Sequence, residues 1–336
     1  MPVTATDVAR RAGVSQSAVS RVFTPGASVS PAMAEKVRKA ADELGYRPNV
    51  LARAMITGRS RIIGLVVAYL DNQFYPDAIE RLSRSLQEEG YHVLLFIAPN
   101  DGADIDGMIG EMLSYQLDGL VMASVAMSHD LARRCEGAGI PVVLFNRGQA
   151  GGVHSTVTSA NVAGGRRVAE FLVACGHRRI AHVAGWQGSS TGQERTAGFL
   201  AGLAEAGLPC TGQIDGLYTR EGAAEATRRL FDTAEKPDAL FVGNDHMAFA
   251  VIDVLRFELG LRVPQDVAVV GYDDTALAAW PAYDLTTVRQ PVNRMVEATV
   301  TALLARIEGR DPAPRRIEIE GELIERGSTL RPERPE

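Results

Sequence analysis

From residue 61 onward the sequence repeats one pattern, in which a short run rich in Val, Ile and Leu precedes an amphipathic stretch. Continuous apolar strands joined by helical crossovers form parallel sheets that helices cover on both faces. Seven such runs are too many for one small sheet, so the pattern predicts an α/β core of two doubly wound lobes. The expected strands cover 62–68, 92–97, 119–123, 142–145, 180–184, 239–243 and 267–271. The expected helices lie near 77–89, 105–115, 131–137, 161–175, 193–206, 221–231 and 246–259.

The segment 156–159, just before Asn161, is interpreted as a crossing point between the two lobes. The pattern then resumes after 285 with a strand, a helix at 293–308 and two strand-like segments at 316–320 and 323–325. We therefore predict a core over 61–330. Its first lobe takes in about 61–159 and 290–320, and its second lobe takes in about 160–289 and 321–330.

Residues 1–48 are predicted to form a separate, all-α head. Thr6 and Ser15 are suitable N-caps for helices at 7–12 and 16–23, and Gly13 suits the left-handed turn between them. Two short helices joined by such a turn are typical of the helix-turn-helix motif. A third helix is expected from Pro31 to Leu44. Its predicted buried face consists of Met33, Val37, Ala40, Ala41 and Leu44.

Charge is distributed unevenly along the chain. Residues 1–60 hold nine Lys or Arg and four Asp or Glu, for a net charge of +5. Residues 61–336 hold 26 and 37, for a net charge of −11. A basic head on an acidic body indicates that the head binds a polyanion and that the body has another task.

The second helix of the head carries short polar side chains on the face opposite its valines. Such donors suit phosphate and base-edge contacts in a DNA major groove. An ordinary capped surface helix is the alternative, and the positive charge of the head favours the DNA-binding interpretation. The residues expected to face outward are Ser15, Gln16, Ser17, Ser20 and Arg21, and Thr6 is assigned with them to the DNA site.

Residues 49–60 are predicted to form a hinge helix and a linker. Asn49 can cap a helix that Gly58 ends, but a helix of about seven residues is not stable alone in water. Its apolar Met55 and its Arg53 suggest that a partner helix and a DNA minor groove give it order. A plain linker is the alternative.

These motifs resemble the lactose-repressor (LacI/GalR) family. The matching segments are Thr6-Asp7-Val8-Ala9, Gly13-Val14-Ser15, Val19-Ser20-Arg21-Val22, Leu44-Gly45-Tyr46-Arg47-Pro48-Asn49, Ile63-Gly64-Leu65, Gly243-Asn244-Asp245, Val269-Val270-Gly271-Tyr272-Asp273-Asp274 and Leu285-Thr286-Thr287-Val288-Arg289-Gln290. The resemblance covers essentially the whole chain. It implies a homodimeric transcription regulator, expected to act as a repressor, that binds double-stranded operator DNA and has a periplasmic-binding-protein-like core. One departure is Met55, which stands where the family usually has Leu.

The resemblance also implies a site for a small-molecule effector, a sugar or sugar derivative, between the lobes. Arg195 would grip ligand hydroxyls or a carboxylate through its planar guanidinium group, and Asp273 would accept hydrogen bonds from vicinal hydroxyls. On this resemblance, alanine substitution of either residue should abolish the effector response and leave folding nearly intact. The other residues assigned to the site are Phe74, Tyr75, Asn146, Asn244 and Gln290.

Three of these effector-site residues have ordinary structural alternatives. Asn244 can be a helix cap, Phe74 can belong to the core and Gln290 can be a hydrogen-bonding residue of the hinge between the lobes. The assignments nevertheless share a position, because most follow predicted strands at their carboxyl ends, where open α/β sheets bind ligands.

The rival interpretation is an enzyme or a solute-binding protein built on the same lobes. The sequence contains no dinucleotide-binding fingerprint, phosphate-binding loop or nucleophile elbow, and its six histidines lack metal-ligand spacing. We therefore expect no enzyme activity, cofactor or metal. No export signal or membrane-length apolar stretch is present, so we expect a cytoplasmic protein without a membrane partner. The three cysteines, Cys135, Cys175 and Cys210, are expected to be reduced core thiols.

Overall fold

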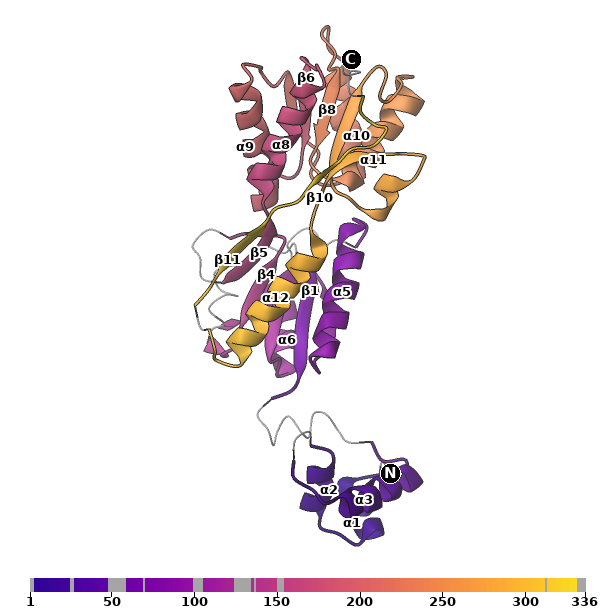
Figure 1. The fold of residues 1–336 in the computed structure, drawn as a ribbon, viewed down its shortest axis with the longest axis vertical. Helices are drawn as coiled ribbons and strands as arrows, with labels where there is room; N and C mark the ends of the chain where they lie inside the picture. Colours follow the sequence, from indigo (N-terminus) through magenta and orange to yellow (C-terminus); the bar gives the residue numbers. More distant parts are fainter. Residues whose placement is uncertain are drawn as a thin grey trace, which may run out of the picture. The chain divides into compact units, whose positions relative to one another are not determined.

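The computed structural model divides into two compact units, residues 1–61 and residues 62–336. Figure 1 shows that the first unit is helical and that the second unit contains two sheets. The residues that the structure describes are 3–24, 27–47, 59–68, 70–98, 105–123, 134–135, 137–149, 154–311 and 313–330.

The head consists of α1 (Ala5–Ala12), α2 (Gln16–Val22) and α3 (Pro31–Leu44). These helices pack around the buried side chains of Val8, Val19 and Val37. Ser15 caps α2 through a hydrogen bond that its side chain accepts from the Ala18 amide, as expected. The all-α helix-turn-helix head is therefore confirmed.

Two details of the head differ from the sequence prediction. The N-cap of α1 is Thr4 rather than Thr6, because Thr4 and Asp7 form a reciprocal capping box. The hydrogen bonds from Thr4 lower the pKa of the Asp7 carboxyl. Met33 lies in the first turn of α3 with 38% of its surface exposed, so it is not part of the buried face.

The first lobe of the core contains a six-stranded, all-parallel sheet in the order β11-β5-β4-β3-β1-β2. One face packs against α5 and α12, and the other face packs against α6. This arrangement is the doubly wound fold that the continuous apolar strands predict. The strands are β1 (Ile62–Val67), β2 (His92–Ile97), β3 (Gly119–Ala123), β4 (Val142–Phe145), β5 (Ser155–Ser159) and β11 (Arg316–Ile319). The helices are α5 (Phe74–Glu88), α6 (Ile105–Ser114) and α12 (Val292–Ile307).

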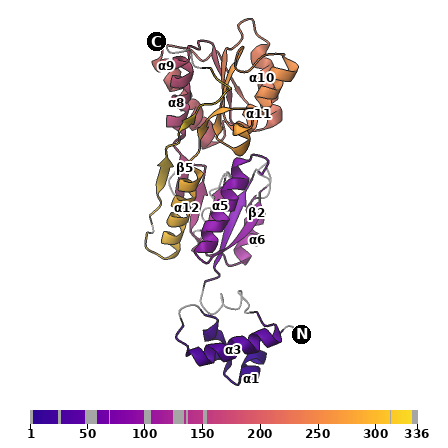
Figure 2. The ribbon, with the colours of Figure 1, turned by 45° about the vertical axis from the view of Figure 1, so that its right-hand side comes forward.

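The second lobe contains a six-stranded sheet in the order β12-β10-β9-β8-β6-β7, in which only β12 is antiparallel to its neighbour. Figure 2 shows α8 and α9 on one side of this sheet and α10 and α11 on the other. The strands are β6 (Ile180–Ala184), β7 (Gly212–Asp215), β8 (Ala239–Val242), β9 (Ala268–Asp273), β10 (Thr286–Arg289) and β12 (Leu323–Ile324). The helices are α8 (Asn161–Ala174), α9 (Ser190–Glu205), α10 (Arg220–Phe231) and α11 (Asp245–Asp253), with a π-helical turn η1 (Val254–Glu258) and a 3-10 turn η2 (Ala276–Ala279).

The chain passes between the lobes after β5, after β10 and after β11. The sequence pattern did not predict β5 or β7 as strands. The residues of β5 are Ser, Thr and Val, and all five are buried, so segment 156–159 is part of a strand that ends where the chain leaves the first lobe. β7 has the sequence Gly-Gln-Ile-Asp and lacks an apolar run, which explains why periodicity misses it.

Helices α8 and α9 lie unusually close together because glycines face each other at their contact. A Cβ atom on Gly198 would lie 1.9 Å from the Val162 carbonyl oxygen, and one on Gly165 would lie 2.2 Å from the Arg195 carbonyl oxygen. Neither position has room for a larger residue. This contact fixes the first turns of α9, which carry Arg195.

Candidate functional site

The head presents a polar surface on its second helix. Gln16, Ser17, Ser20 and Arg21 are exposed, and Ser17 Oγ lies 2.9 Å from Oγ of the capping Ser15. Helix α2 thus carries hydrogen-bonding groups on its outer face while its Ala18 and Val19 are buried. Thr6 is also exposed, but it lies within α1 and caps nothing.

The predicted hinge falls outside the described residues. Asn49, Arg53 and Met55 all lie between residue 47 and residue 59, where the description stops and resumes. Their assignment to the DNA site stays a prediction from the sequence.

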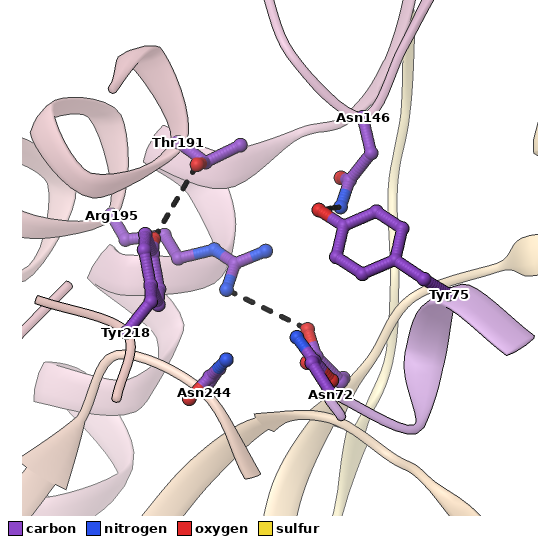
Figure 3. Close-up of a pocket in the computed structure, with 8 residues that line it drawn as sticks. Asn72, Tyr75, Asn146, Thr191, Arg195, Tyr218 and Asn244 are labelled. Carbon is purple, nitrogen blue, oxygen red and sulfur yellow. Dashed lines mark hydrogen bonds and ion pairs between the residues drawn. The ribbon is translucent and has the colours of Figure 1, made fainter. Parts of the chain in front are cut away.

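The core contains a pocket between its two lobes. Figure 3 shows side chains converging on it from both lobes. Its residues follow the carboxyl ends of strands or begin the next helix, which is where ligands bind in doubly wound folds. The lining residues are Asn72, Tyr75, Asn146, Thr191, Arg195, Tyr218, Asn244 and Asp273.

Arg195 is almost completely buried and is held by groups of its own lobe. Its Nε donates to Asn161 Oδ1 at 3.0 Å, and its Nη1 donates to the Gly243 carbonyl oxygen at 2.7 Å. The guanidinium carbon lies 3.7 Å from the centroid of the Tyr272 ring, a cation–π contact. These contacts hold the guanidinium plane before any ligand arrives.

Asp273 ends β9 beside Arg195, with its Oδ1 atom 3.6 Å from Arg195 Nη1 and 2.7 Å from Gln290 Nε2, which donates to it. Burial raises the pKa of the Asp273 carboxyl to about 7, although Arg195 opposes this shift. Asp245 lies behind it, and burial raises the pKa of that carboxyl to about 6 against hydrogen bonds from Thr287 and Thr275. Burial therefore raises the pKa of the Asp273 carboxyl, and that of Asp245 behind it, toward neutral pH.

Five of the seven expected effector residues line the pocket. Arg195 and Asp273 face the pocket together, and Asn146 Nδ2 donates to the Tyr75 hydroxyl at 3.3 Å across from them. Asn244 caps α11 through the hydrogen bond that it accepts from the Met247 amide, which confirms its alternative as a helix cap. It also lines the pocket, and its contact with an effector stays a prediction.

Phe74 and Gln290 do not line the pocket. Phe74 begins α5 with its side chain turned toward the sheet, where it stacks on Phe145 at a centroid distance of 6.2 Å. The next residue, Tyr75, takes the position facing the pocket. Gln290 lies behind Asp273 and donates to it, which corresponds to its alternative as a hydrogen-bonding residue near a lobe crossover.

Three lining residues were not assigned from the sequence: Asn72, Thr191 and Tyr218. Asn72 lies in the loop before α5, three residues before Tyr75, and its proximity to that residue is the signal that could have identified it. Tyr218 follows the unpredicted strand β7 and has a left-handed φ of 59°, which no sequence pattern indicates. Its hydroxyl donates to Thr191 Oγ1 at 3.4 Å.

Comparison with known proteins identifies both parts of the chain. The model of the bacterial regulatory proteins, lacI family, matches residues 4–49, and that of the periplasmic binding protein-like domain matches residues 169–329. The HTH-type transcriptional regulator CelR of Thermobifida fusca is 35% identical over 330 residues, which cover 96% of each chain. The chain belongs to the LacI family.

Other members of the LacI family agree with this result. The ribose operon repressor of Escherichia coli K12 is 32% identical over 327 residues, covering 96% of this chain and 98% of the repressor. A structure of the lac repressor dimer bound to operator and an anti-inducer superposes with a TM-score of 0.88 at 27% identity, covering 98% and 100% of the two chains. A CelR–cellobiose complex superposes with a TM-score of 0.73 at 34% identity, covering 97% and 99%.

The described residues add two negative findings for this LacI-family chain. None of their helices has the length and apolar character needed to cross a membrane. Within the same ranges, no group of three or more His, Cys, Asp or Glu side chains is placed to hold a metal ion. The cysteines form no disulfide, and only Cys135 of the three is fully buried.

Proposed function

We propose that this LacI-family regulator acts as a homodimeric repressor whose affinity for its operator is controlled by a sugar or sugar derivative. Membership of the family makes it an effector-controlled, DNA-binding transcription regulator, and its relatives are regulators rather than enzymes. The repressor role, the dimer and the sugar class are our proposals. The similarity to the ribose operon repressor and to the CelR structure in complex with cellobiose supports the sugar class.

The observation that carries the effector proposal is the composition of the pocket. Its lining offers a guanidinium group, a carboxylate, three amides and three hydroxyls, and no large apolar side chain other than two tyrosines. A ligand rich in hydroxyl groups can both donate to and accept from such a lining. The tyrosine rings suit the apolar face of a sugar ring.

For the DNA site, we propose that Gln16, Ser17, Ser20 and Arg21 contact the operator in the major groove. Their support is the exposed polar face of α2 and the net positive charge of the head. Asn49, Arg53 and Met55 are proposed to act in the minor groove, on the strength of the sequence pattern of the hinge and the family resemblance.

The experiment that tests this function measures effector binding and its effect on DNA binding. The full chain is first screened by thermal shift against cellobiose, ribose, other sugars, sugar acids, polyols and nucleobases. An operator is selected from random DNA, and its affinity is measured by fluorescence anisotropy with and without each stabilising compound. A sugar that both stabilises the protein and changes operator affinity supports the proposal. Stabilisation by a nucleobase alone would refute the sugar class.

A further inference from the structure

A buried arginine lies next to the pocket and does not belong to its lining. Arg147 follows Asn146 directly after β4 and is only 7% exposed. It makes no hydrogen bond or ion pair with any residue in the described part of the chain, and its Nε is shielded from solvent. The structure shows its guanidinium group 5.5 Å from the ring centroid of Trp186, which belongs to the other lobe. Burial of a cation without an anionic partner is costly. Because Arg147 has no such partner among the described residues, its position favours the binding of a negatively charged group.

The surroundings of Arg147 add positive potential. The Gly148 amide donates to Oγ of Ser190, the first residue of α9, at 2.8 Å. Trp186 lies in the loop before this helix, and its carbonyl oxygen accepts from Oγ of the N-cap, Ser189, at 2.7 Å. The guanidinium group therefore lies near the N-terminus of a 16-residue helix, whose unpaired amides carry partial positive charge.

Asp215 contacts this loop, but its carboxylate is already engaged by backbone amides. Asp215 Oδ2 accepts from the Gln187 amide at 3.0 Å, and Oδ1 accepts from the Leu217 amide at 2.8 Å. It forms no ion pair with Arg147. None of the described residues around this loop therefore neutralises the charge of Arg147.

The positive region adjoins one end of the pocket. Figure 3 shows Asn146 and Thr191 at one end of the cavity and Asn72 and Asn244 at the other. Asn146 has a left-handed φ of 57°, and its buried Oδ1 lacks a hydrogen-bond partner among the described residues. Arg147 directly follows Asn146 along the chain, and Ser190 directly precedes Thr191. The pocket wall at this end is thus continuous with Arg147 and the N-terminus of α9.

We propose that the pocket extends past Asn146 and Thr191 into an anion subsite formed by Arg147 and the N-terminus of α9. The effector would then be a sugar derivative with a phosphate or carboxylate group at one end and hydroxyl groups at the end near Asp273. Only the sugar part of this inference rests on the proposed function. The anion would join a residue of the first lobe to a helix of the second, and so favour the closed arrangement of the lobes.

The first experiment compares matched neutral and anionic probes. Ribose is compared with ribose 5-phosphate, and glucose with glucose 6-phosphate and glucuronate, by calorimetry on the full chain at constant ionic strength. We expect an anionic probe to bind about 30-fold more tightly than its neutral counterpart, because it satisfies a buried cation. Arg147→Met keeps the length of the side chain and should abolish this preference, whereas Arg147→Lys should retain part of it.

A matched control separates the subsite from general electrostatics. Arg84→Met makes the same change of charge at an exposed position on α5 of the first lobe, and it should retain the full preference. Trp186 supplies a spectroscopic signature in a Trp280→Phe background, where it is the only tryptophan. Its fluorescence should change with the anionic probes and with inorganic phosphate, since these reposition the guanidinium group above its ring.

The outcomes distinguish this inference from the proposed function. Equal affinity for neutral and anionic probes, or a preference that survives in Arg147→Met, would overturn the subsite while leaving a sugar-responsive regulator intact. Failure of all sugars, with thermal stabilisation by inorganic phosphate that Arg147→Met removes, would support the subsite and reject the sugar class. Failure of inorganic phosphate and of every anionic probe would overturn the subsite.

Discussion

Replacing Arg195 with alanine should destabilise the protein as well as remove its effector response. The family resemblance alone leads to the expectation that folding is nearly unaffected. In the structure, however, the guanidinium group is 3% exposed and is tied to Asn161, Gly243 and the ring of Tyr272. Arg195→Ala would leave the carboxylate of Asp273 buried without its neighbouring cation.

The contacts of Arg195 allow the loss to be estimated. Removing one member of a buried ion pair costs about 3–5 kcal/mol, because the remaining charge and hydrogen-bonding groups stay buried. This is a large part of the roughly 5–15 kcal/mol by which proteins are usually stable. For a core of this size it corresponds to a decrease in Tm of about 6–20 °C. The cost should be smaller at pH 6 than at pH 8, because a carboxyl whose pKa is already about 7 can take up a proton instead.

The assay is thermal and urea-induced unfolding of the full chain at pH 6 and pH 8, together with titration of the best sugar probe. Arg229→Ala is the control, because it removes an exposed arginine from the same lobe. Effector affinity should fall by about 30-fold or more in Arg195→Ala through the loss of a charged hydrogen bond. An unfolding free energy equal to that of the control would show that the buried contacts of Arg195 contribute nothing to stability.

Three further changes test the pocket, the packing of the second lobe and the head. Asp273→Asn should raise stability over that of the parent more at pH 8 than at pH 5. The folded-state pKa of Asp273, about 7, exceeds the usual 3.8, so the parent loses stability as pH rises between these values and the variant does not. Parallel pH–stability curves for parent and variant would contradict this. Gly198→Ala should cost about 1–3 kcal/mol or more through its clash with the Val162 carbonyl, measured by urea unfolding, and wild-type stability would reject the close contact. Gln16→Ala should alter operator preference in DNA selection, whereas Lys36→Ala should reduce affinity uniformly or little; the reverse result would place the recognition helix elsewhere.

Local features of the fold were predictable because they depend on neighbouring residues. Ser15 and Pro31 mark the beginnings of α2 and α3 through capping and through proline geometry, which need no distant contact. The start of α1 was misplaced because Thr4 and Thr6 are both suitable caps. Only Thr4 has an acidic residue three positions later, which completes the capping box.

By itself, the sequence determined the helix-turn-helix head, the alternation of strands and helices and the family to which the chain belongs. Through the family resemblance, it also indicated Arg195 and Asp273 as residues of the pocket. Continuous apolar runs and caps are properties of short segments, so they can be identified without coordinates.

Tertiary structure alone decided which side chains surround the pocket. It turned Phe74 into the core and Tyr75 toward the cavity. It also placed Tyr218, which follows a strand without an apolar run, in the pocket lining. It also buried Arg147 beside a helix N-terminus from the other lobe. The physical reason is that the burial and the partners of a side chain depend on where distant segments pack, and the periodicity of a sequence carries no information about that packing.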